Sequence, residues 1–220
     1  MNIIQSKQYD FKYNDNAHIG KFWINDEFSF LKIPKNSSTT ILEEFNLEDS
    51  DLKYNQMADR KLFTIIRNPI ERFVSAFLEV LEPSEEYPNG RYKYVSIPYI
   101  YLIEIEEIFK LPVIDRMNTY IEFIGNNGFI ELHCTPQVQY IYDINGHYIE
   151  LEMFRNYDII NVESDLYKFL GITSSLDNHN VTNSVTNKKL LLEYINNNDD
   201  VKERICEIYQ EDIKLYESIK

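Results

Sequence analysis

The segment at 61–81 constrains the fold of this sequence more than any other. Residues 61–67 read KLFTIIR and are apolar almost throughout, as expected of a strand that is buried on both faces of a sheet. Asn68 can cap a following helix, Pro69 suits the first helical position, and Glu71 completes the start signal. The next apolar residues recur at i, i+3, i+4 and i+7, which predicts a helix over 69–81 with one buried face: Ile70, Phe73, Val74, Phe77, Leu78 and Leu81.

The same order of strand and helix occurs once before this segment, with a strand at 28–33 (FSFLKI) and a helix from about Thr39. After it, the sequence predicts a tyrosine-rich loop at 83–98, helices at 98–110 and 116–125, a hairpin at 139–151 around Asn145-Gly146, a strand at 157–163, a helix at 165–172 stopped by Gly171, and an amphipathic helix at 201–219. Strands alternating with helices predict an α/β fold with a central, mainly parallel sheet flanked by helices. The 220 residues contain no repeat or low-complexity linker, so we expect a single domain over 1–220.

Composition excludes several classes of partner and site. The net charge of −14 disfavours binding to nucleic acid or to an anionic membrane surface. Two cysteines do not make a disulfide framework, and four scattered histidines give no support for a metal site. The sequence has no signal-peptide pattern and no apolar run long enough to span a membrane, so we expect a cytoplasmic protein without a bound metal.

A polar turn separates the first strand from its helix. It reads PKNSSTT at 34–40 and carries one lysine and four hydroxyl side chains but no glycine. A strand, a polar turn and a helix N-terminus commonly bind a phosphate-like anion. The common phosphate loop ends in Gly-Lys-Ser/Thr, whereas here the lysine comes first. The alternative is a solvated connection in which Ser38 only caps the helix.

A second set of polar residues follows the second strand. Arg67 lies at its carboxyl end, where ligands of open α/β sheets bind, and Ser75 lies two turns into the next helix. Arginine can grip a phosphate with two parallel hydrogen bonds, and a helical hydroxyl can add another donor. Alternatively, Arg67 forms a structural ion pair and Ser75 is a small residue where the helix meets the sheet.

Together, the two stretches resemble the sulfotransferases that use 3′-phosphoadenosine 5′-phosphosulfate (PAPS). Their first motif, Pro-Lys followed by small and hydroxyl residues, matches 34–40, and their second, Arg-Asx-Pro-x-x-Arg-x-x-Ser, matches 67–75. The resemblance implies a P-loop-like three-layer fold. It implies that Arg67 and Ser75 hold the 3′-phosphate and that the 5′-phosphosulfate is bound by Lys35, Asn36, Ser37, Ser38, Thr39 and Thr40.

Later segments are similar to the carbohydrate sulfotransferases of the chondroitin 4-O type. They are TYIEFI (119–124), HCTPQ (133–137), IYDINGHYIEL (141–151) and NVT (180–182), so that the resemblance covers about 28–216. The chain departs from the pattern at Ser37, where many members have glycine or alanine, and at Cys134, where they have tryptophan. The sequence also lacks the many cysteines of the Golgi enzymes, and we expect no membrane anchor like theirs.

The resemblance implies transfer of a sulfuryl group from PAPS to an acceptor hydroxyl, with PAP as product, no metal, and a glycan as the acceptor. Lys35 would neutralise charge that develops on the oxygen bridging phosphorus and sulfur. His133 is our candidate for the general base, because it lies in the HCTPQ segment and imidazole suits that role. Gln137 would contact or orient the substrate. A carboxylate at Glu43, Glu44 or Glu48 is the alternative base.

The sequence leaves two alternative functions open. A P-loop-type kinase would explain the strand, turn and helix, but not a lysine at the start of the turn or the lack of an acidic residue after LFTIIR. A non-catalytic relative that binds PAP or a glycan is the second, and the presence of Lys35, Arg67 and Ser75 argues against it.

Overall fold

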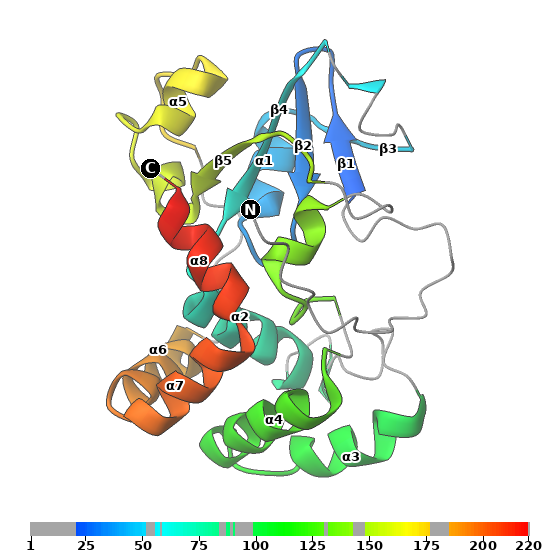
Figure 1. Cartoon of the computed structure of the whole chain (residues 1–220), viewed down its shortest axis with the longest axis vertical. Coiled ribbons are helices and arrows are strands. Elements are labelled where there is room, and N and C mark those ends of the chain that lie inside the picture. Colours follow the sequence, from blue (N-terminus) through cyan, green and yellow to red (C-terminus); the bar gives the residue numbers. More distant parts are fainter. Residues whose placement is uncertain are drawn as a thin grey trace.

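The computed structural model describes residues 21–51, 56–57, 59–83, 87–88, 90, 99–129, 132–142, 148–176 and 185–219. A five-stranded sheet forms one part of the molecule, and a group of helices packs below it in the view of Figure 1. The strands are β1 (Lys21–Ile24), β2 (Phe28–Lys32), β3 (Glu48–Ser50), β4 (Lys61–Ile66) and β5 (Glu152–Arg155). The helices are α1 (Ser38–Glu44), α2 (Pro69–Leu81), α3 (Tyr99–Phe109), α4 (Val113–Asn127), α5 (Asp165–Leu170), α6 (Val185–Asn196), α7 (Asp199–Ile208) and α8 (Gln210–Ser218), with 3₁₀ turns η3 (Gln137–Ile141) and η4 (Asn156–Ile160).

The sheet has the order β3-β1-β2-β4-β5. β2, β4 and β5 run parallel, and Phe30 lies opposite Phe63 in the β2–β4 register. β1 is antiparallel to both of its neighbours. The carboxyl ends of β2 and β4 therefore meet at one edge of the sheet, which brings the turn at 33–37 next to Arg67.

Both faces of the central strands are buried, as the apolar sequences predict. Phe28, Phe30, Phe63 and Ile65 pack on one face with residues of α1 and α5. The opposite face of β2 and β4 is covered by η3 and α8 in two smaller clusters. Side chains alternate between the two faces with the period of two that a pleated strand imposes.

A helical core forms the second part of the molecule. α2 contributes one side of it, and α3, α4, α6 and α7 contribute the rest. Asn68 caps α2 by accepting hydrogen bonds from the Ile70 and Glu71 N–H groups, and Pro69 begins the helix. Because the N-terminus of α2 follows β4 directly, this capped helix start is held at the carboxyl edge of the sheet.

Several sequence predictions are confirmed. The strands at 28–33 and 61–67 correspond to β2 and β4, and the helix at 69–81 is α2 with the predicted bounds. The helices predicted near 39, at 98–110 and at 116–125 are α1, α3 and α4. α5 ends at Gly171, whose left-handed φ of 71° suits glycine.

The expected mainly parallel sheet is only partly confirmed, because β1 and β3 were not predicted and both pair antiparallel. β1 and β2 are joined by a three-residue turn in which the Asn25 side chain accepts hydrogen bonds from the Glu27 and Phe28 N–H groups. Such a short connection can only join antiparallel strands. The structure thus has an α/β fold with a mixed five-stranded sheet flanked by helices.

The strand predicted at 157–163 is wrong. The strand in this region is β5 at 152–155, and η4 follows it. The Asp158 carboxylate accepts a hydrogen bond from the Arg155 N–H, and the Asn161 side chain accepts one from the Glu163 N–H. These local side-chain bonds compete with strand pairing, and Ile160 is left 75% exposed.

Three further differences concern the second half of the chain. The predicted helix at 201–219 is two helices, α7 and α8, that meet at Tyr209, and α6 was not predicted. Tyr209 is anchored there by its hydroxyl, which donates to the Cys134 carbonyl. In the predicted hairpin at 139–151, Tyr142 and Tyr148 form an antiparallel bridge, but the chain before it is the 3₁₀ turn η3. The tip at 143–147 and most of the predicted loop at 83–98 lie outside the described residues.

Candidate active site

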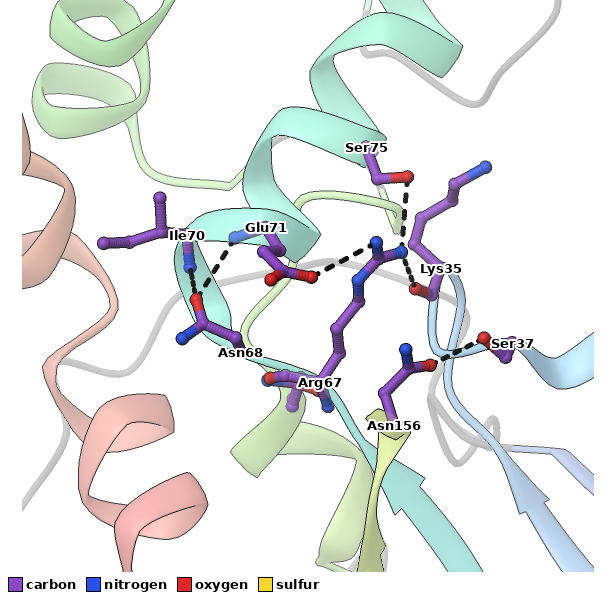
Figure 2. A network of polar contacts seen from close by, with 9 residues as sticks. Lys35, Ser37, Arg67, Asn68, Ile70, Glu71, Ser75 and Asn156 are labelled. Carbon is purple, nitrogen blue, oxygen red and sulfur yellow. Dashed lines mark hydrogen bonds and ion pairs between the residues drawn. The ribbon is translucent and has the colours of Figure 1, made fainter. Parts of the chain in front are cut away.

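The turn between β2 and α1 has an unusual backbone for a segment without glycine. Lys35 and Ser37 both adopt the left-handed region, with φ of 68° and 58°. Each such residue with a side chain costs about 1–2 kcal/mol. Ser37 Oγ donates to Asn156 Oδ1 over 2.6 Å (Figure 2). Ser38 Oγ donates to the Ile33 carbonyl over 2.8 Å. The turn is therefore held in shape by bonds at both of its serines.

The start of α1 retains hydrogen-bonding capacity. Ser37 occupies the N-cap position but makes no side-chain cap bond. The first N–H groups of a helix have no partner within the helix. Thr40 is 1% exposed, and its hydroxyl oxygen is buried without a hydrogen-bond partner. The turn can thus offer several donors to an anion.

Arg67 reaches from the end of β4 to the same turn (Figure 2). One terminal nitrogen donates to the Lys35 carbonyl at 3.1 Å and lies 3.4 Å from Ser75 Oγ. The other terminal nitrogen lies 3.6 Å from the Glu71 carboxylate. Arg67 Nε is buried without a partner. Burial lowers the pKa of Arg67, and the charge of Glu71 opposes that shift.

Lys35 points its ammonium group toward α2. Its Nζ lies 3.1 Å from Glu79 Oε2, and the two side chains are 21% and 26% exposed. The structure therefore brings Lys35, Arg67 and Ser75 together, from the three separate elements that the sequence predicted. Glu79 was not predicted, although it lies four residues after Ser75 and this spacing places the two on the same side of α2.

Lys188 in α6 is a third cation near the site that sequence reasoning missed. Burial lowers the pKa of Lys188, the positive charges of Arg67 and Lys35 lower it further, and Glu71 raises it. These influences arise because α6 packs along α2. The only sequence signal was the pair of lysines at 188–189, which follows the segment similar to the family's late Asn-Val-Thr.

A buried polar network joins the two motifs. The Gln137 side chain accepts hydrogen bonds from Asn36 Nδ2 at 2.6 Å and from the Arg67 N–H at 2.9 Å, and it donates to the Arg67 carbonyl at 2.9 Å. Asn36 Nδ2 also donates to the Ile65 carbonyl. Asn36 and Gln137 are both fully buried. These contacts join Gln137 to Asn36 and Arg67, and both predicted roles of Gln137, contacting or orienting the substrate, stay predictions.

Asp212 of α8 fixes this network from the other side. Its carboxylate accepts hydrogen bonds from the Gln137 and Val138 N–H groups, at 2.8 and 2.9 Å. Complete burial raises the pKa of Asp212, while Arg72 and these hydrogen bonds oppose the shift. Arg72 itself is 1% exposed and donates to the carbonyls of Pro34 and Thr135. Arg72, the second arginine of the motif at 67–75, thus links α2 to the turn after β2 and to the segment before η3.

The candidates for the general base lie on different elements. His133 is half-buried and lies in the segment that leads into η3. The carbonyls of the residues before and after it accept hydrogen bonds from the hydroxyls of Tyr140 and Tyr209. Glu43 and Glu44 are exposed on α1, and Glu48 is exposed on β3. The choice of His133 over these carboxylates stays a prediction.

A polar turn beside an arginine at a strand end of an α/β sheet is the arrangement in which nucleotide-dependent transferases bind anions. A family model described as "Sulfotransferase family" matches residues 6–217, so the chain belongs to the sulfotransferase family. Members of this family generally use PAPS and release PAP. No curated protein and no solved structure gives a significant match. The family match does not favour the kinase or the non-catalytic alternative.

Two features are absent from the described residues. No helix in this part of the chain combines the length and apolar character needed to cross a bilayer. No group of three or more His, Cys, Asp and Glu side chains within these ranges is arranged to hold a metal ion.

Proposed function

We propose that this protein transfers a sulfuryl group from PAPS to a hydroxyl group of a glycan. The observation that carries the proposal is the position of Arg67, whose guanidinium is fixed between the Lys35 carbonyl and Ser75 Oγ at the carboxyl edge of the sheet. An arginine and a hydroxyl at this edge fit a 3′-phosphate, and the adjoining lysine-first turn fits a 5′-phosphosulfate.

The unpaired polar atoms of the site support this cofactor. Arg67 Nε and Thr40 Oγ1 are both buried without a partner, and such atoms are costly unless a ligand or water satisfies them. Arg67 and Ser75 would hold the 3′-phosphate, and the positive charge of Lys188 would add to the local attraction. The N–H groups of the turn at 35–40 and the Thr40 hydroxyl would hold the 5′-phosphosulfate, in a P-loop-like arrangement. Bound there, PAPS supplies an activated sulfuryl group.

Two side chains would act on the reacting atoms. Lys35 would stabilise negative charge at the bridging oxygen, where charge develops as the sulfur–oxygen bond breaks. His133 would accept the proton of the acceptor hydroxyl, which requires a neutral imidazole. This chemistry needs no metal ion.

The proposal also includes the chemical class of the acceptor and the cellular location of the protein. A glycan follows from the similarity of the segments at 119–124, 133–137 and 141–151 to carbohydrate sulfotransferases. The net charge of −14 opposes nucleic acid and anionic membrane surfaces as partners. We propose that the protein acts in the cytoplasm.

Binding of PAP without metal tests the proposal. Calorimetry should show much tighter binding of PAP than of 5′-AMP or ATP, because only PAP carries the 3′-phosphate. Arg67→Ala should cost about 2–4 kcal/mol of PAP binding, since a charge-assisted contact is lost and the phosphate is left partly unpaired. Lys168→Ala, which removes an exposed cation on α5, is the control and should change little. Equal affinity for PAP and 5′-AMP would contradict the proposal.

Turnover gives an independent test of Lys35. The charge that Lys35 offsets grows mainly in the transition state, so Lys35→Ala should lower kcat roughly 100-fold or more. PAP affinity should fall much less. Normal turnover with weakened PAPS binding would show that Lys35 only positions the cofactor.

A further inference from the structure

Helix α2 presents a row of three polar side chains to Lys35 and Arg67, two of the three cations near the site. Glu71, Ser75 and Glu79 are spaced four residues apart, which places them along one side of a helix. Glu71 lies 3.6 Å from the Arg67 guanidinium and Glu79 lies 3.1 Å from the Lys35 ammonium. Ser75 lies between them and contacts Arg67. Lys35 and Arg67 are thus each already paired with a carboxylate of one helix.

We propose that Glu71 and Glu79 compete with the cofactor for the cations of the site. In the free protein, each carboxylate occupies the position that one anionic end of the cofactor takes when it binds. Glu79 occupies Lys35 where the 5′ end binds, and Glu71 occupies Arg67 where the 3′-phosphate binds. Both carboxylates then weaken cofactor binding and favour release of PAP. This inference rests on the proposed function, because it assumes that the anions of PAP bind to these two cations.

Charge explains why such competition has an effect. Lys35, Arg67 and Lys188 supply three positive charges, and the two glutamates cancel two of them. PAP brings two phosphate monoesters, each with a charge of about −1.5 to −2. Each phosphate must displace a carboxylate or bind beside it, and like charges at such short range repel strongly where water is partly excluded.

The two pairs differ in burial, which makes the competition unequal. The Lys35–Glu79 pair is largely shielded from solvent, with side chains 21% and 26% exposed. Glu71 is 49% exposed, so it can turn toward water when an anion approaches Arg67. Removal of the Glu79 charge should therefore strengthen binding more than removal of the Glu71 charge.

The two ends of PAP allow the two glutamates to be tested separately. Calorimetry at low ionic strength would measure the dissociation constants of PAP and 5′-AMP for the wild type, Glu79→Gln and Glu71→Gln. Glu79→Gln should tighten both ligands, each about 5- to 20-fold, because both carry a 5′-phosphate. Glu71→Gln should tighten PAP about 2- to 5-fold and leave 5′-AMP unchanged. Glutamine keeps the shape of each side chain.

Glu104→Gln is the matched control, because Glu104 is an exposed glutamate on α3 and its loss changes the net charge by the same amount. It should leave both affinities unchanged. Equal tightening in all three variants would mean that only the overall charge matters and would overturn the inference. Unchanged or weaker PAP binding in both Glu79→Gln and Glu71→Gln would overturn it as well. If the wild type itself does not discriminate PAP from 5′-AMP, the proposed function fails and the inference fails with it.

Turnover separates competition from a direct role in the chemistry. As a competitor, Glu79 can be removed without loss of the chemical step, so single-turnover rates with saturating PAPS should stay within about threefold of the wild type. A loss of 100-fold or more in Glu79→Gln, together with unchanged PAP affinity, would identify Glu79 as a catalytic group and overturn its assignment as a competitor.

Discussion

Replacement of Gln137 by alanine should destabilise the whole protein, although Gln137 belongs to a segment that resembles a substrate-binding motif. The side chain is fully buried and bonds to the main-chain N–H and carbonyl of Arg67 and to the side chain of Asn36. Alanine leaves both Arg67 groups without a partner, at about 1–3 kcal/mol for each. A cavity adds to this cost, and water that enters would offset part of it. We expect a loss of about 3–5 kcal/mol in the free energy of unfolding.

Urea denaturation followed by circular dichroism would measure this change directly. For a chain of this size, about 4 kcal/mol corresponds to a drop of roughly 8–16 °C in Tm. Gln139→Ala is the matched control, because Gln139 lies in the same 3₁₀ turn η3 but is partly exposed, and it should change stability by less than about 0.5 kcal/mol. A loss below about 1 kcal/mol in Gln137→Ala would refute the reasoning. A double-mutant cycle with Asn36→Ala should give a coupling energy of about 0.5–3 kcal/mol.

Three further predictions concern single residues of the site. Ser37→Gly should be more stable than Ser37→Ala by about 1–2 kcal/mol. Both variants lose the hydrogen bond to Asn156, but only glycine removes the backbone strain at φ of 58°. Equal urea midpoints of the two variants would contradict this prediction. Lys188→Met should weaken PAP binding about 5- to 30-fold. The pKa of Lys188 is lowered from its usual 10.5, so this lysine loses its charge at lower pH than an exposed one. The affinity of the wild type for PAP, measured by calorimetry, should therefore fall as the pH rises toward 10.5. The Lys188→Met variant should lack that fall. His133→Gln should lower kcat 100- to 10,000-fold and leave PAP affinity intact; near-normal activity would place the base elsewhere.

The sequence predicted the parts of the fold and site that depend on local patterns. α2 was predictable because its cap, its proline and its apolar face all lie within 68–81. The lysine-first turn and Arg67 were predictable because each follows an apolar strand, and the carboxyl ends of parallel strands meet. Strand pairing brings Lys35 and Arg67 together, and that pairing follows from the two buried strands.

The remaining features depend on contacts between distant segments. Asp212 is one of two acidic residues in the first turn of α8, and nothing in that pattern shows that its carboxylate is buried against Gln137. Asn156 follows a strand that the sequence placed several residues too late, so its bond to Ser37 could not be foreseen. Lys188 lies in α6, a helix that the sequence did not predict. In each case tertiary contacts, which no local pattern encodes, give the residue its place.

The contact between Arg67 and the Lys35 carbonyl shows why the two motifs act as one unit. Lys35 has a left-handed backbone without being glycine, and such a conformation persists only when its surroundings hold it. Arg67 supplies part of that support, because its guanidinium fixes the carbonyl of this strained residue at 3.1 Å. Arg67→Ala should therefore loosen the turn as well as remove the ligand of the 3′-phosphate. Binding of 5′-AMP should weaken about 2- to 5-fold in Arg67→Ala, which is less than the loss for PAP but not zero. Ser75→Ala leaves the carbonyl contact in place, so it should weaken PAP alone. If calorimetry shows that Arg67→Ala leaves 5′-AMP binding unchanged, the turn keeps its shape without Arg67 and the two motifs are independent.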